Sequence, residues 1–238
     1  MVIPAHNEAS RLPPSLAQIN GFLDQQDFSA EVIIVENGSS DRTYEVAQEA
    51  ARESDRIRVL QSPKGIRGKG LAVKQGMLAA NGDWRFMCDA DLSMRIEDLA
   101  GFLPPQTHGY DIVIASREAP GAESVGEPEY RHIMGRVATF IIKLAAIKDY
   151  EDTQCGFKLF SANVAEDLFR VQRMNGIGFD VELLYIAKRR GYRVKELPIT
   201  WYYDPYSTMR LWDDSVQLLR EIWEIRRNWR QGLYEREQ

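Results

Sequence analysis

Residues 32–41 read VIIVENGSSD, and this stretch decides the fold class. The four consecutive apolar residues at 32–35 are typical of a strand that is buried on both faces, as in a parallel sheet covered by helices. A polar turn follows, in which Asp41 is predicted to be the N-cap of a helix that runs to about Ser54. A buried strand, a polar turn and a helix together form one unit of an α/β fold.

The same alternation continues along the first half of the chain. Short apolar runs predict further strands at residues 2–3, 57–60, 84–88 and 112–115. Stretches with helical periodicity lie between these runs, at residues 12–23, 70–80 and 96–103. We therefore predict an α/β protein whose mostly parallel sheet is flanked by helices.

The second half of the chain has a different pattern. Its predicted elements are a helix at 130–148, a short strand at 156–160, a helix at 179–189 and an extended segment at 193–201. Residues 209–229 predict an amphipathic helix, one face of which carries Trp212, Val216, Leu219 and Trp223. We expect one α/β domain over residues 1–205 and a C-terminal amphipathic segment over residues 206–238. That segment would pack on the domain, form a dimer face or lie on a membrane surface.

Composition excludes several classes of protein. Of the 238 residues, 44% are hydrophobic and 27% are charged, which excludes a disordered or collagen-like chain. The net charge of −5 argues against duplex binding, so no nucleic-acid partner is expected. Cys88 and Cys155 form no CxxC pair and are expected to be buried thiols. Since neither a signal peptide nor a spanning apolar run is visible, we expect a cytoplasmic protein, with peripheral attachment to the cytoplasmic membrane face left open.

Polar segments follow every predicted strand of the first half. They are PAHNE at 4–8, ENGSSD at 36–41, SPKGIRGKG at 62–70, DADLS at 89–93 and SR at 116–117. Ligands bind at the carboxyl ends of parallel strands, so these segments are expected to line one crevice.

Two of these segments predict binding chemistry. Asp89 and Asp91 follow an apolar strand, and carboxylate oxygens at this spacing suit Mg²⁺ or Mn²⁺, with phosphates and water as the other ligands. A turn that only caps the next helix is the alternative. The glycine-rich loop at 65–70 permits close backbone approach, and Lys69 with its basic neighbours suits a diphosphate. A flexible basic loop is the alternative there.

Seven motifs occur in order across roughly residues 1–230. They are VIPAHNE at 2–8, VENGSSDRT at 35–43, GKGLAVKQG at 68–76, DADLS at 89–93, ASR at 115–117, DTQCGFKLF at 152–160 and GFDVELL at 178–184. This pattern resembles the family 2 glycosyltransferases with a GT-A fold. Within them it is most similar to the polyprenyl-phosphate (dolichyl-phosphate) glucosyl- and mannosyltransferases.

The resemblance implies sugar transfer from UDP-glucose, which we slightly favour, or from GDP-mannose to a polyprenyl phosphate, with Mg²⁺ or Mn²⁺ and inversion at the anomeric carbon. The predicted nucleotide-sugar-binding residues are Pro4, His6, Glu8, Glu36, Asn37, Asp41, Lys69, Ala90 and Gln154. The predicted catalytic residues are Asp89, Asp91, Arg117, Arg131 and Asp152, of which the first two hold the metal. The predicted acceptor-phosphate residues are Arg117, Arg131, Ser207 and Arg210. The family usually has two aspartates where this chain has Glu36 and Asn37.

Three other functions remain open at this stage. The same fold could transfer sugar to a soluble phosphate such as a glycerate, or bind a nucleotide sugar without catalysis. A nicotinamide-dependent dehydrogenase would need GxGxxG after the first strand, where residues 4–7 read PAHN.

The implied transfer reaction needs no strong general base, because a phosphomonoester oxygen is already anionic at pH 7. Glu182 is predicted either to tether a loop or to face the sugar.

Overall fold

The computed structural model describes residues 1–63, 65–126, 128, 147–203 and 211–235, and only the backbone of 211–215. The strands are β1 (Val2–Ala5), β2 (Val32–Glu36), β3 (Ile57–Gln61), β4 (Trp84–Met87), β5 (Ile112–Ser116), β6 (Glu123–Val125), β7 (Lys158–Ser161), β8 (Val194–Pro198) and β9 (Thr200–Tyr202). The helices are α1 (Leu12–Leu23), α2 (Thr43–Glu53), α3 (Lys69–Ala79), α5 (Ala162–Val171), α6 (Phe179–Arg189) and α7 (Leu211–Arg230), with a 3₁₀ helix, η1 (Ile96–Gly101).

Seven strands form the central sheet in the order β3-β2-β1-β4-β7-β5-β8. β1, β2, β3 and β4 are mutually parallel where they pair, and β5 is parallel to β8. β7 lies antiparallel between β4 and β5. The prediction of a mostly parallel sheet is confirmed, and β6 and β9 add a separate parallel pair.

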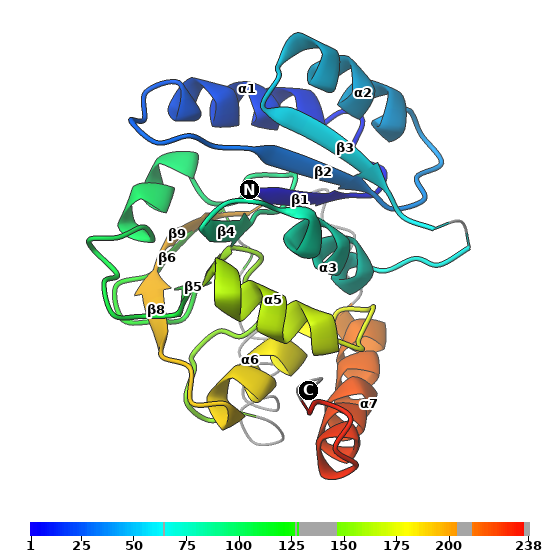
Figure 1. Cartoon of the computed structure of the whole chain (residues 1–238), viewed down its shortest axis with the longest axis vertical. Coiled ribbons are helices and arrows are strands. Elements are labelled where there is room, and N and C mark those ends of the chain that lie inside the picture. Colours follow the sequence, from blue (N-terminus) through cyan, green and yellow to red (C-terminus); the bar gives the residue numbers. More distant parts are fainter. Residues whose placement is uncertain (64, 127, 129–146, 204–210, 236–238) are drawn as a thin grey trace.

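Helices cover both faces of this sheet, as Figure 1 shows. One core contains residues of α1, α2 and η1, and the other contains residues of α3, α5, α6 and α7. Val32 and Ile34 of β2 belong to the first core, whereas Ile33 and Val35 belong to the second. The apolar run at 32–35 is therefore buried on both faces, as its composition predicts.

Two predicted elements begin or end differently in the structure. α2 begins at Thr43, and Asp41 is not its N-cap. The Asp41 carboxylate accepts hydrogen bonds from the Thr43 and Ala9 amides, so it organises the turn before the helix. The predicted helix at 96–103 is the short η1, because Pro104 and Pro105 follow it and disfavour continued helix.

The second half also contains elements that the sequence analysis missed. α5 buries Val164, Ala165, Leu168 and Phe169, whose helical spacing was the available signal. β6 is only three residues long and all three are exposed, so it carries no apolar pattern. The long helix predicted at 130–148 lies almost entirely outside the described residues.

α7 packs beside α6 with one of its faces. Leu218, Ile222 and Ile225 are buried in the core, and the Gly178 amide donates a hydrogen bond to Glu221 Oε2 at 2.5 Å. Val216 and Trp223, from the predicted apolar stripe, are exposed instead. Within the described part of the chain, no helix is long and apolar enough to cross a membrane.

Candidate active site

Asp89 lies just beyond the carboxyl end of β4 and contacts two other elements. Its Oδ1 is 2.6 Å from Nζ of Lys69, the first residue of α3. On the other side, Gly156 approaches so closely that a methyl group there would overlap the Asp89 carboxylate. Desolvation lowers the pKa of Lys69, but the charges of Asp89 and Asp180 outweigh it and raise that pKa above its usual value. The ammonium group therefore stays charged beside Asp89.

Asp91 stands two residues further along and is partly buried. Its Oδ1 accepts a hydrogen bond from the Ser93 amide at 3.2 Å. Burial raises the pKa of Asp91, and the charge of Asp89 raises it further. Two carboxylates that share a poorly solvated position favour a bound cation.

The donor chemistry of this pair fits Mg²⁺ or Mn²⁺, which prefer hard oxygen ligands. Among the described residues, no group of three or more His, Cys, Asp or Glu side chains is placed to enclose a metal ion. Asp89 and Asp91 would supply two carboxylate ligands to such an ion. Such an incomplete set is typical of Mg²⁺ sites, in which substrate phosphates and water complete the coordination.

Glu8 follows β1 and lies in the electrostatic field of these aspartates. Its carboxylate pairs with Arg11 at 2.6 Å. Burial raises the pKa of Glu8, Arg11 lowers it, and the charges of Asp91 and Asp89 add to the rise. The structure thus brings the polar ends of β1 and β4 together, as the crevice prediction requires.

Asn37 joins three of the strand-end loops. Its Nδ2 donates to Ser62 Oγ and its Oδ1 accepts from the Gly68 amide, both at 2.8 Å. Its backbone oxygen is 2.9 Å from Nδ1 of His6. The loops after β1, β2 and β3 therefore form one wall, which the side chain of Asn37 holds together.

Glu36 and Asp41 shape the same wall. Glu36 is buried, with Oε1 accepting from the Ser39 amide at 2.5 Å and Oε2 from Gln61 Nε2 at 3.3 Å. Asp41 is exposed, and desolvation raises its pKa while hydrogen bonds from Thr43 and Ala9 lower it below its ordinary value. Both carboxylates thus organise the turn that follows β2.

The remaining predicted nucleotide-site residues lie at the same edge of the sheet. Pro4 is in β1 and pairs with Val35. The Ala90 carbonyl, beside Asp89, accepts a hydrogen bond from Ser15 Oγ at 2.6 Å. The Gln154 amide donates to Asp152 Oδ1 at 3.0 Å.

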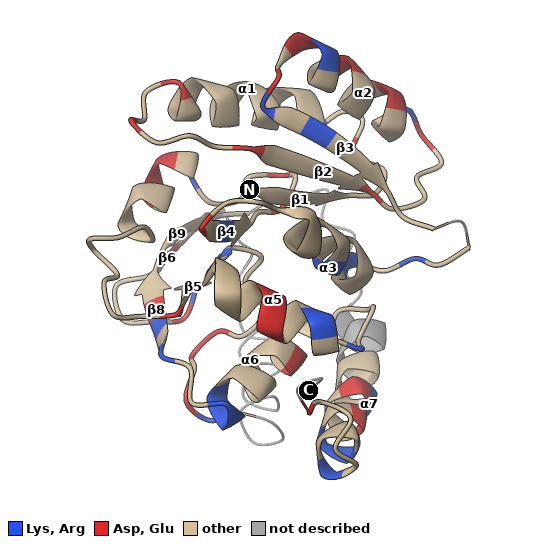
Figure 2. Ribbon diagram, viewed as in Figure 1, with Lys and Arg blue, Asp and Glu red and all other residues tan. Residues whose placement is uncertain are grey.

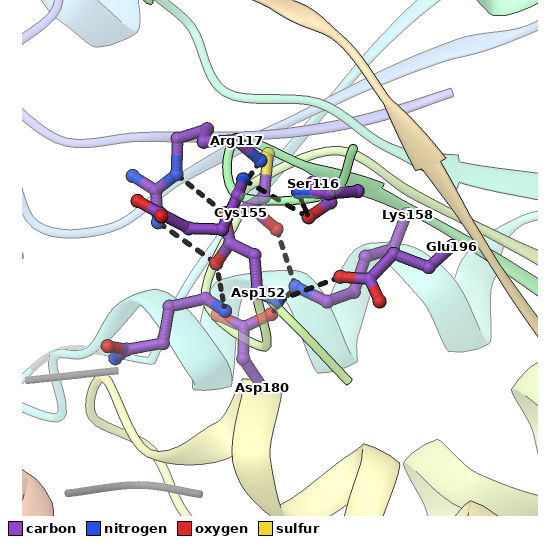
Figure 3. Close-up of polar contacts among 10 residues, drawn as sticks. Ser116, Arg117, Asp152, Cys155, Lys158, Asp180 and Glu196 are labelled. Atoms are coloured by element: carbon purple, nitrogen blue, oxygen red, sulfur yellow. Dashed lines mark hydrogen bonds and ion pairs between the residues drawn. The ribbon is translucent and has the colours of Figure 1, made fainter. Parts of the chain in front are cut away.

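Arg117, after β5, forms a two-bond pair with Asp152 (Figure 3). The Nε–Oδ2 distance is 2.6 Å and the Nη2–Oδ1 distance is 3.1 Å. The Asp152 side chain is 3% exposed and that of Arg117 is 32% exposed. Burial raises the pKa of Asp152, but the charge and hydrogen bonds of Arg117 outweigh it and lower that pKa. The guanidinium also lies over the Trp201 ring, 5.2 Å from its centroid.

A buried ion pair that the sequence analysis missed lies beside this site (Figure 3). Lys158 Nζ is 2.5 Å from Asp180 Oδ1, and also donates to the Cys155 carbonyl. The sequence signal for this pair was a lysine, Lys158, in an otherwise apolar strand and an aspartate, Asp180, in an otherwise apolar part of a helix. Burial raises the pKa of Asp180, and the charges of Lys158 and Lys69 oppose that rise. Lys158 also contributes to the lowered pKa of Asp152, so the pair links the two halves of the site electrostatically.

Glu182 has a structural role in this arrangement. It is fully buried, and its carboxylate accepts hydrogen bonds from the Arg173 and Met174 amides and from the Tyr234 hydroxyl. The structure therefore supports the tethering interpretation. Cys88 and Cys155 are buried free thiols, as predicted.

Three predicted site residues cannot be placed. Arg131, Ser207 and Arg210 lie outside the described residues. The structure thus brings Glu8, Lys69, Asp89, Asp91, Arg117 and Asp152 to one edge of the sheet.

Comparisons with known proteins show the family and the fold of this chain. Dolichyl-phosphate beta-glucosyltransferase of Drosophila melanogaster is 34% identical, over 94% of this chain and 73% of that relative. The Homo sapiens protein of that name is 30% identical, over 100% of this chain and 78% of that relative. A crystal structure of glucosyl-3-phosphoglycerate synthase from Mycobacterium tuberculosis with Mn²⁺, uridine-diphosphate and phosphoglyceric acid is 18% identical. It covers 100% of this chain and 78% of that chain with a TM-score of 0.66, and shows a shared fold.

The family model described as Glycosyl transferase family 2 matches residues 1–169, which include the strand ends that carry Glu8, Asn37, Lys69, Asp89 and Arg117. The match also spans Asp152 and the close approach of Gly156 to Asp89. This chain therefore belongs to glycosyltransferase family 2, as its motifs predict, and has the GT-A fold.

Proposed function

We propose that this protein transfers glucose from UDP-glucose to a dolichyl-type polyprenyl phosphate, with a divalent metal ion and inversion at the anomeric carbon. The observation that carries the proposal is the Asp89–Lys69 contact at 2.6 Å, with the partly buried Asp91 beside it. A carboxylate pair next to a lysine offers both a metal site and a positive charge for a diphosphate. The names of the relatives support the choice of glucose and of a lipid phosphate.

The reaction needs two anions held in line. An oxygen of the acceptor phosphate forms the new bond to the anomeric carbon, and the bond from that carbon to the β-phosphate oxygen breaks, so UDP leaves with the electron pair. Bound Mg²⁺ or Mn²⁺ supplies charge neutralisation to the departing diphosphate. In this scheme, Lys69 turns from Asp89 toward that diphosphate. The nucleotide-sugar side of the site is formed by Pro4, His6, Glu8, Glu36, Asn37, Asp41, Ala90 and Gln154.

Arg117 receives the acceptor phosphate in this scheme. Its planar guanidinium is partly exposed, and pairs well with phosphate oxygens. Asp152 is nearly fully buried behind it, so Asp152 acts as a positioning residue that fixes the orientation of Arg117. The proposed roles of Arg131, Ser207 and Arg210 toward the same phosphate, and the division of the chain at residue 205, remain predictions.

The test measures glucose transfer to a polyprenyl phosphate by product mass, with Mn²⁺ and with chelator. Asp91→Ala should abolish transfer and the metal-dependent rise in melting temperature on adding UDP. Asp83→Ala is the matched control, because Asp83 is exposed at the opposite end of β4. Near-normal transfer by Asp91→Ala would refute the metal assignment. Transfer to 3-phosphoglycerate alone would assign a soluble acceptor. A rise in melting temperature with GDP-mannose alone would assign GDP-mannose, not UDP-glucose, as the donor.

A further inference from the structure

α7 has an apolar surface that the protein core does not cover. Val216, Leu219 and Trp223 have exposed fractions of 47%, 42% and 64%. They lie on the side of the helix opposite the buried Leu218 and Ile225. One side of α7 thus packs against the core. Core packing does not account for the apolar residues on the opposite side.

The basic and acidic residues of α7 lie on different sides of the helix. At 3.6 residues per turn, four arginines lie within about 60° of Trp223 around the helix axis, and every acid lies about 80° or more away. The arginines are Arg220, Arg226, Arg227 and Arg230, and all are exposed. Arg227 lies over the Trp223 ring at 5.0 Å and is 3.6 Å from Glu224 at the flank. We call these four arginines with Val216, Leu219 and Trp223 the outer face of α7.

We propose that the outer face of α7 binds an anionic lipid surface, an inference that rests on the proposed lipid acceptor. Arginines around exposed tryptophan and aliphatic side chains match a layer of acidic headgroups over acyl chains. The net charge of −5 would repel such a surface, so attraction must come from a local basic region. Figure 2 shows blue residues at the lower, C-terminal end of α7.

A second copy of this chain fits the same face poorly. In a two-fold dimer the same patch meets itself, so the arginines of one copy would face those of the other. Like charges brought together in this way repel. The lipid surface is therefore the occupant that the charge pattern favours.

The inner side of α7 is attached to a loop beside the active site. Gly178, just before α6, donates its amide to Glu221 of α7. In the same loop, the Asn175 carbonyl contacts Gly68 so closely that no side chain fits there, directly before Lys69. The loop that anchors α7 thus also packs against the residue that precedes Lys69, in the proposed diphosphate site.

The experiment uses the full chain with vesicles of phosphatidylcholine alone and with 30 mol% phosphatidylserine. We expect flotation with the anionic vesicles and its loss in high salt. Each arginine near such a surface strengthens binding by about fivefold, so Arg220→Gln/Arg227→Gln should weaken it about 25-fold. Arg42→Gln/Arg52→Gln is the matched control, because these exposed arginines lie just before α2 and in its last turn, and it should bind as the wild type does.

Two further measurements separate this inference from the proposed function. With a short-chain, water-soluble isoprenyl phosphate, the Arg220→Gln/Arg227→Gln variant should keep wild-type turnover, whereas turnover of a long-chain acceptor in vesicles should fall. Vesicle binding without transfer to any acceptor would uphold the inference and reject the proposed function. Absence of wild-type binding, unchanged binding by the variant, or a dimer that Trp223→Gln dissociates would overturn the inference.

Discussion

Substitution of Lys158 by methionine tests the buried ion pair beside the active site. The Lys158 side chain is fully buried and that of Asp180 is 5% exposed. Methionine keeps most of the aliphatic stem but removes the ammonium group 2.5 Å from Asp180 Oδ1. The substitution therefore leaves the Asp180 carboxylate buried without its main partner.

Loss of one partner of a buried pair costs about 3–5 kcal/mol, because the remaining charge is desolvated and unpaired. For a chain of this length that corresponds to a fall in melting temperature of about 6–20 °C. The double variant Lys158→Met/Asp180→Leu removes both charges, so it should recover most of the loss.

Urea denaturation followed by tryptophan fluorescence measures these free energies of unfolding. Burial already raises the pKa of Asp180, and removal of Lys158 raises it further. A carboxyl whose folded pKa exceeds its unfolded value takes up a proton on folding between these two pKa values, so stability rises as pH falls through the folded pKa toward the unfolded pKa. The difference in free energy of unfolding between the wild type and Lys158→Met should therefore become smaller as the pH falls from 7 to 5. A loss below about 1 kcal/mol, or a double variant less stable than the single one, would refute the reasoning.

Three further predictions concern single side chains. Gly156→Ala should displace the Asp89 carboxylate and lower transfer activity by about 100-fold while the fold is retained, as measured by turnover and circular dichroism. Tyr234→Phe removes the hydroxyl that donates to Glu182 Oε1 at 2.6 Å, and should lower the free energy of unfolding in urea by about 1–3 kcal/mol without changing UDP binding. Burial raises the pKa of Cys155 to about 12, so its reaction with a thiol reagent at pH 8 should be much slower in the native protein than in denaturant.

Each of these predictions has its own control or contrary outcome. Gly21→Ala adds a methyl group where no atom lies within 4 Å, so it should leave activity unchanged. Tyr202→Phe alters an exposed tyrosine and should leave stability unchanged. Rapid labelling of native Cys155 would show that its side chain is reached by solvent, contrary to the structure.

The strand ends show how far the sequence alone leads. The apolar run at 32–35 and the polar segments after it predict a buried parallel strand with a ligand edge, and both faces of β2 are indeed buried. This works because strand burial and turn chemistry are local properties of consecutive residues. Asp89 and Asp91 are predicted as a metal site in the same way, from a carboxylate pair directly after an apolar run.

Pairings between distant segments were harder to foresee. Nothing local shows that β7 inserts antiparallel between β4 and β5, although this places the approach to β7 against Asp89. The partners Lys158 and Asp180 are 22 residues apart, and Arg117 and Asp152 are 35 apart. Their ion pairs depend on which elements become neighbours, which a single sequence does not specify.

α7 shows the same division within a single element. The sequence alone determined that this segment is a helix with Val216, Leu219 and Trp223 at one helical spacing. Only the tertiary structure decided that this stripe faces outward, because Leu218 and Ile225 fill the space against α6 and the core. Helical periodicity defines which residues share a face, whereas the shape of the neighbouring core selects the face that is buried.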